Sequence, residues 1–79
     1  MTQMHVMLHT INDVKEFVEI VSKVEFDVDL ISGRYAVDAK SIIGIFSLDL
    51  AGPIKVNIYS DDCADLMASL QKFAAQHKD

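Results

Sequence analysis

The chain has 79 residues, a formal net charge of −5 and a single cysteine, which is enough for one small domain over residues 1–79. The acidic balance argues against nucleic acid as a partner, because a phosphate backbone would repel the protein. One cysteine excludes an internal disulfide and favours a reducing, cytoplasmic setting. The sequence has no secretory signal pattern and no apolar run that approaches the length of a membrane span.

The first half of the chain predicts a strand, a helix and a hairpin. Alternation predicts a first strand that buries Met4, Val6 and Leu8. Helical spacing follows, with an inner face of Ile11, Val14, Phe17, Val18 and Val21 and an N-cap at Thr10 or Asn12. Alternation then returns on both sides of the turn Ser32-Gly33, which predicts a hairpin that begins at Phe26 and ends at Asp38.

The second half predicts a short helix, a fourth strand and a final helix. The short helix covers residues 41–48, and Gly52-Pro53 breaks the chain after it. Alternation of Ile54, Val56 and Ile58 predicts the fourth strand. Ser60 or Asp61 is expected to cap the last helix, with an inner face of Leu66, Met67, Leu70, Phe73 and Ala74.

The element order is βαββαβα, and it predicts an α+β fold. Strands with one apolar and one polar face favour an antiparallel sheet that is covered on one side only. We therefore expect an open-faced β-sandwich, in which three helices cover one face of a four-stranded antiparallel sheet. Ferredoxin-like domains share most of this order, so a small-ligand-binding domain of that type is an alternative. That alternative predicts that the strand beginning at Phe26 is not next to the strand beginning at Ile54.

The middle of the chain resembles the HPr family, the phosphocarriers of the bacterial phosphotransferase system. The similarity covers residues 20–73 and is carried by Ser22-Lys23, Phe26-Asp27-Val28-Asp29-Leu30, Gly33-Arg34 and Ala39-Lys40-Ser41-Ile42-Ile43-Gly44-Ile45-Phe46-Ser47-Leu48. The core of the last segment is most similar to HPr from low-GC Gram-positive bacteria. The resemblance implies the same open-faced sandwich.

The catalytic motif of that family is not recognisable upstream. In HPr, a Gly-[Ile/Leu]-His-Ala-Arg-Pro-Ala motif opens the first helix, and its histidine accepts phosphate from enzyme I. An ungapped alignment places Thr10 at the histidine, Asn12 at the arginine and Asp13 at the proline. We therefore expect no catalytic residue here, no cofactor and no enzyme activity. The alternative is an active phosphocarrier that uses His9, where Asp13 would repel the incoming phosphate and no arginine would clamp it.

The segment from Lys40 to Phe46 is the strongest candidate for a functional site. Ser41 is a natural N-cap, and the resemblance implies that it is also the regulatory serine that HPr kinase phosphorylates. Lys40 adds a nearby positive charge. Such a short helix cannot bury all of its apolar residues, so Ile42, Ile43 and Phe46 are expected near solvent, where they would form a docking surface. The matching helix of HPr docks enzyme I, the serine kinase and the catabolite repressor.

The remaining candidates have plainer interpretations. Asp27, Asp29 and Asp38 are expected on a solvated face rather than at a metal site, because they lack the spacing of a ligand loop. Cys63 is expected in the first turn of the last helix, in a structural role. His5 is predicted on the open face or edge of the sheet, and His77 in a fraying tail. The sequence thus favours a regulatory or adaptor protein of the phosphotransferase system without histidine phosphocarrier chemistry.

Overall fold

The computed structural model describes residues 1–75. Strands and helices follow one another in the predicted order, βαββαβα. The strands are β1 (Thr2–Val6), β2 (Val28–Ser32), β3 (Tyr35–Asp38) and β4 (Ile54–Ile58). The helices are α1 (Ile11–Val21), α2 (Ile42–Phe46) and α3 (Ala64–Leu70), and the 3-10 turn η1 (Gln71–Phe73) follows α3. In residues 1–75, no helix combines the length and the apolar character needed to cross a bilayer.

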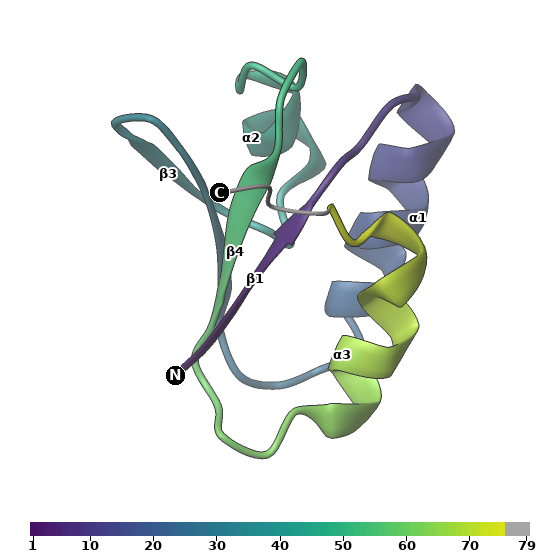
Figure 1. The fold of residues 1–79 in the computed structure, drawn as a ribbon, viewed down its shortest axis with the longest axis vertical. Helices are drawn as coiled ribbons and strands as arrows, with labels where there is room; N and C mark the ends of the chain where they lie inside the picture. The colour runs from purple at the N-terminus through teal and green to yellow at the C-terminus, as the bar shows by residue number, and fades with distance from the viewer. Residues whose placement is uncertain (76–79) are drawn as a thin grey trace.

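The four strands form one antiparallel sheet with the order β1-β4-β2-β3. α1 and α3 lie on the same side of this sheet (Figure 1), and all three helices contribute buried residues to one core. β2 pairs directly with β4, and Leu30 lies opposite Val56. The expected open-faced sandwich is therefore confirmed. The ferredoxin-like alternative is wrong, because that arrangement would separate these two strands.

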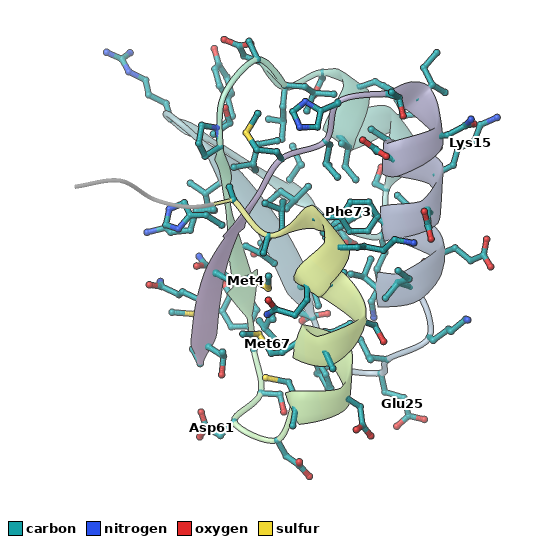
Figure 2. All side chains as sticks on the ribbon, turned by 45° about the vertical axis from the view of Figure 1, so that its right-hand side comes forward. Met4, Lys15, Glu25, Asp61, Met67 and Phe73 are labelled. Atoms are coloured by element: carbon teal, nitrogen blue, oxygen red, sulfur yellow. The ribbon has the colours of Figure 1, made fainter. Side chains whose placement is uncertain are left out.

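The core forms where the apolar face of the sheet meets the helices. Alternate residues of β2 and β4 point inward, and Val28, Leu30, Ile54, Val56 and Ile58 are fully buried. From the helix side, the ring of Phe17 on α1 contacts the ring of Phe73 in an edge-to-face arrangement with 5.9 Å between centroids. Figure 2 shows the side chain of Phe73 between η1 and α1. Such contacts stabilise the packing by about 1 kcal/mol beyond area burial. Phe73 thereby fixes η1 against α1.

Several predicted element boundaries are wrong at the ends of helices and strands. Ile11 was expected inside, yet it is 63% exposed, because it occupies the first helical position, outside the reach of the sheet. β1 ends at Val6, although Leu8 beyond it is buried as expected. β2 begins only at Val28, and Phe26 before it is half-buried. Ala74 lies beyond the last helix and is exposed.

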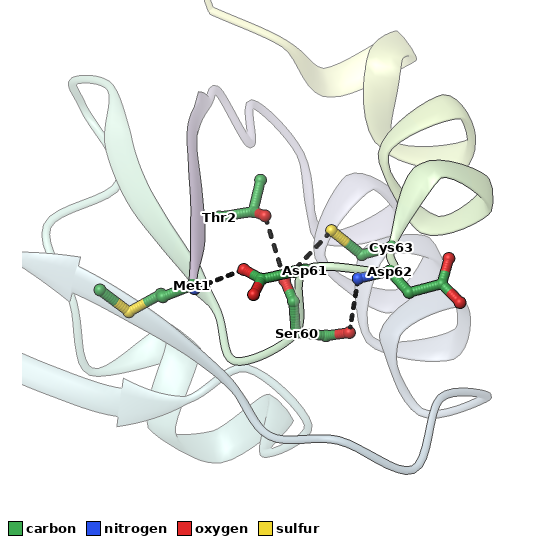
Figure 3. Close-up of polar contacts among 6 residues, drawn as sticks. All are labelled: Met1, Thr2, Ser60, Asp61, Asp62 and Cys63. Carbon is green, nitrogen blue, oxygen red and sulfur yellow. Dashed lines mark hydrogen bonds and ion pairs between the residues drawn. The ribbon is translucent and has the colours of Figure 1, made fainter.

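The last helix begins later than predicted and lacks a side-chain cap. α3 starts at Ala64, and Cys63 occupies the N-cap position. Ser60 is instead used in the preceding turn: its hydroxyl accepts the N–H of Asp62 at 3.1 Å and its carbonyl accepts the Thr2 hydroxyl at 3.0 Å. Asp61 binds the N-terminal ammonium of Met1 at 2.8 Å (Figure 3). The two residues predicted to cap α3 therefore make their side-chain contacts before the helix begins.

The tight turn between β2 and β3 requires its glycine. Gly33 has a φ of +59°, a backbone conformation that a side chain disfavours. The turn contains only Gly33 and Arg34 between the strands, which matches the two-residue hairpins that place glycine at the first central position. This turn sets the register in which Asp29 lies opposite Asp38.

Candidate functional site

The N-terminus of α1 is closed by its own side chains. Thr10 is the N-cap, and its hydroxyl accepts the backbone N–H of Asp13 at 3.0 Å. In return, the carboxylate of Asp13 accepts the backbone N–H of Thr10 at 3.3 Å and that of His9 at 2.8 Å. This reciprocal capping box satisfies donors that a helix otherwise leaves free. A negative charge therefore already occupies the point where a helix N-terminus would hold a phosphate.

His9 lies exposed beside this capping box. Its imidazole borders an open hollow of about 510 Å³ that Asp13, Pro53 and Lys72 also line. The ammonium of Lys72 is paired with the carboxylate of Glu16. Among the described lining residues, the hollow therefore has the carboxylate of Asp13 and an already paired lysine, but no arginine that could clamp a phosphate.

Ser41 caps α2, as the sequence predicts. Its hydroxyl accepts the backbone N–H of Gly44 at 3.2 Å, and Ser41 itself is exposed. Gly44 packs close to the cap: a Cβ at this position would lie 3.3 Å from the Ser41 hydroxyl oxygen and 3.4 Å from Cβ of Val37. The hydroxyl is thus held at a helix start, in contact with solvent, on a helix that packs against β3.

α2 divides its apolar side chains between the core and the solvent. Ile45 is fully buried and Leu48, just past the helix, is 8% exposed. On the other side, Ile43 is 81% exposed and Phe46 is 46% exposed, whereas Ile42 is half-buried and packs against the core. The expectation of exposed apolar residues is confirmed for Ile43 and Phe46 and holds only in part for Ile42.

Lys40 has a structural contact that the sequence did not predict. Its ammonium donates to the backbone carbonyl of Val24 at 2.8 Å, which ties the segment before α2 to the turn after α1. Its backbone N–H donates to the Asp38 carboxylate at 2.9 Å. The positive charge expected beside Ser41 therefore has a fixed partner elsewhere. Figure 1 shows α2 and the start of α1 at the same end of the molecule.

The other predicted features fall outside this site. Cys63 is buried and free, and its thiol lies 3.6 Å from the carbonyl of Ser60. Asp27 and Asp38 are exposed and Asp29 is half-buried. No group of three or more potential metal ligands occurs in residues 1–75. His5 lies on β1, an outer strand, opposite Lys55, and His77 lies outside the described residues.

The capping role of Asp13 was the main functional detail that sequence reasoning missed. The signal was present as Thr10 followed three residues later by a carboxylate, which is the pattern of a capping box. From the sequence, Asp13 is expected only to repel an incoming phosphate. In the structure, the Asp13 carboxylate would repel a phosphate, and it also accepts two backbone N–H groups at this helix end. Those two donors are therefore not free to bind a phosphate.

Comparison with known proteins yields structural neighbours only. No protein-family model and no curated protein matches the chain. The crystal structure of HPr-C-His from Thermoanaerobacter tengcongensis is 24% identical, with a TM-score of 0.76 over 91% of this chain and 89% of that one. The phosphocarrier protein HPr from Bacillus anthracis strain Ames is 21% identical, with a TM-score of 0.74 over 94% and 96% of the two chains. The chain therefore has the HPr fold, with a threonine-aspartate capping box at the start of its first helix.

Proposed function

We propose that this protein is a regulatory or adaptor member of the phosphotransferase system that binds protein partners through α2. The partners are of the catabolite-control type: a serine kinase, a repressor or an enzyme I-like protein, in the cytoplasm. The observation that carries the proposal is the exposure of Ile43 and Phe46, at 81% and 46%, on a helix capped by an exposed serine.

The energetics of the exposed side chains support docking. Full burial of an isoleucine or phenylalanine side chain stabilises a complex by roughly 1.5–3 kcal/mol. Ile43 and Phe46 lie one helical turn apart, so they share one face of α2. Ile45 anchors that helix from the opposite side. The face is thus held rigidly, which limits the entropy lost when a partner binds.

Phosphorylation of Ser41 is the proposed means of regulation. The hydroxyl is exposed and lies at the start of α2, where a phosphate gains from nearby backbone N–H groups. It would also place about two negative charges beside the apolar face of Ile43 and Phe46. A kinase could therefore change partner choice without unfolding the helix. The ammonium of Lys40 already donates to the carbonyl of Val24. The backbone N–H groups at the start of α2 would therefore be the main hydrogen-bond donors to the phosphate.

Phosphocarrier chemistry at His9 is not favoured. The backbone N–H groups of His9 and Thr10 already donate to Asp13, and a phosphoryl group on the imidazole would meet that carboxylate. Incubation with enzyme I and phosphoenolpyruvate should therefore leave no acid-labile phosphate on the protein. Acid-labile label that disappears in His9→Ala would contradict the proposal and establish the phosphocarrier alternative.

Docking is tested by titration of the ¹⁵N-labelled protein with purified enzyme I, HPr kinase and catabolite repressor from a Gram-positive bacterium. We expect amide shifts centred on α2 with at least one of them. Ile43→Ser and Phe46→Ala should weaken that binding at least tenfold. Tyr59→Ala is the matched control, because Tyr59 is 47% exposed at the far end of β4. Absence of binding, or equal weakening by the control, would refute the docking surface.

Phosphorylation is tested separately with HPr kinase and ATP. The expected result is an acid-stable mass increase on the wild-type protein that is absent from Ser41→Ala. Ser47→Ala serves as a matched control, since Ser47 lies at the opposite end of α2 and is exposed as well. An unmodified wild-type protein, or equal modification of Ser41→Ala, would remove the regulatory serine from the proposal.

A further inference from the structure

β3 forms one edge of the sheet, and its outer side has no strand beside it among the described residues. Figure 1 shows it at the left margin, away from α1 and α3. In the antiparallel ladder with β2, Ala39 donates to the carbonyl of its partner Val28 at 2.8 Å. Hydrogen-bonded pairs alternate along such a ladder, so Tyr35 and Val37 also bond to β2. The backbone groups of Ala36 must point outward.

Ala36 therefore stands at the centre of an open edge. Its N–H and C=O both face away from β2, as does the N–H of Asp38. The carbonyl of Asp38 is already used, because it accepts the N–H of Ser41 at 3.0 Å. Unpaired strand edges are templates for another strand. The edge available here is short, and its one complete donor-acceptor pair belongs to Ala36.

We propose that β3 pairs antiparallel with β3 of a second copy of this chain, about a two-fold axis at Ala36. In this register, the two Ala36 residues exchange both of their backbone hydrogen bonds. Arg34 then lies opposite Asp38 of the second copy, twice over by symmetry. Tyr35 lies opposite Val37 of the second copy. The two sheets continue into one eight-stranded sheet, an isologous arrangement of the commonest kind.

The charges on this edge are complementary in that register. Arg34 and Asp38 have opposite signs and stand two residues to either side of Ala36. Within one molecule, Asp38 lies directly opposite Asp29 on β2, in a non-hydrogen-bonded pair that brings the side chains close. Like charges in this position are unfavourable. The guanidinium of Arg34 from a second copy would add a positive charge beside this pair, whose Asp38 carboxylate already accepts the backbone N–H of Lys40.

The apolar side of the same edge also suits a second strand. Tyr35 is 71% exposed although it points to the helix-covered side of the sheet, because no helix reaches that end of the hairpin. Val37 of the second copy would pack against its ring, and aromatic and β-branched cross-strand pairs are favourable. Since one four-residue strand from each copy makes the contact, the interface is small and the dimer weak and concentration-dependent.

The first test is Ala36→Pro, measured by analytical ultracentrifugation over a wide dilution series. Proline removes an N–H that faces the open edge, a position that edge strands tolerate, so the ladder with β2 survives. We expect wild-type protein to form dimers at high concentration and Ala36→Pro to stay monomeric, with unchanged circular dichroism. A monomeric wild type at every concentration, or a dimer that Ala36→Pro leaves intact, would overturn the proposal.

The second test checks the register with exchanged charges. Arg34→Asp and Asp38→Arg should each lower the dimer fraction at least tenfold at a given concentration, because each places like charges across the axis. An equimolar mixture should restore dimers, since both cross-strand pairs are then opposite in sign. A mixture that stays monomeric while each variant is folded would refute the ion-pair register. These measurements need no kinase or partner protein, so their outcome is independent of the proposed function.

Discussion

The division of α2 into a buried and an exposed side makes a quantitative prediction about two neighbouring isoleucines. Ile45 is fully buried in the core, and Ile43 is 81% exposed two residues earlier on the same helix. Truncation of a buried isoleucine to alanine costs about 2–5 kcal/mol, because the transfer free energy of the removed atoms is lost and a cavity is left behind. Truncation of an exposed one costs less than about 0.5 kcal/mol, and alanine is the better helix former.

These magnitudes are large against the expected stability of the domain. A chain of 79 residues has a free energy of unfolding of about 4–12 kcal/mol, so Ile45→Ala removes a large part of it. In urea, a slope of about 1–3 kcal/mol per molar converts this loss into a midpoint lower by roughly 1 M or more. Ile43→Ala should leave the midpoint unchanged.

Equilibrium unfolding in urea, followed by far-ultraviolet circular dichroism, measures both variants against the wild type. The slope should stay constant, which shows that the denatured state has not changed. A loss of about 2 kcal/mol or more in Ile43→Ala would refute the reasoning. It would show that Ile43 packs inside the protein, and the docking surface on α2 would lose the observation on which it rests.

Three further predictions follow from local contacts. Thr10→Ala should lower the free energy of unfolding by about 1 kcal/mol, because the N-cap of α1 is lost. In thermal unfolding, the midpoint should fall by about 4–8 °C. Thr10→Ser keeps a capping hydroxyl and should retain most of the wild-type stability. Gly33→Ala should cost about 1–2 kcal/mol, because φ is +59° there. Gly52→Ala, where a Cβ meets nothing within 4 Å, should be neutral in the same urea assay. The hydrogen bond between the Tyr59 hydroxyl and Asp29 is the main reason that the pKa of Tyr59 is raised above 10.0. A raised pKa means that folding favours the protonated phenol, so the stability that this hydrogen bond contributes is lost as the pH rises through the pKa of the folded state. Absorbance titration of tyrosinate should show the pKa of Tyr59 falling in Asp29→Asn, and an unchanged titration would contradict the assignment.

Local patterns in the sequence predicted much of the fold because they depend on short distances along the chain. Alternation of Ile54, Val56 and Ile58 identified β4, and all three side chains are buried. The exposure of Ile43 and Phe46 followed from helix geometry, since a helix of five residues cannot turn every apolar side chain toward one core.

The predicted caps failed where neighbouring segments compete for the same groups. Thr10 caps α1 as expected, because its partner Asp13 lies within the same turn. Asp61 does not cap α3, because its carboxylate binds the N-terminal ammonium. The hydroxyl of Ser60 does not cap it either, because it accepts the N–H of Asp62 in the preceding turn. The ammonium that binds Asp61 is 60 residues away in the sequence, so no local pattern reports that contact.

By itself, the sequence determined the elements, their faces and the absence of the HPr histidine motif, since each depends on residue type and short-range spacing. Only the tertiary structure decided which strands are neighbours, because the same element order allows two sheets that differ in long-range hydrogen bonding. The pairing of β2 with β4 leaves β3 on the outside. That placement turns Arg34, Ala36 and Asp38 into an open edge, a property of the assembled sheet rather than of the hairpin.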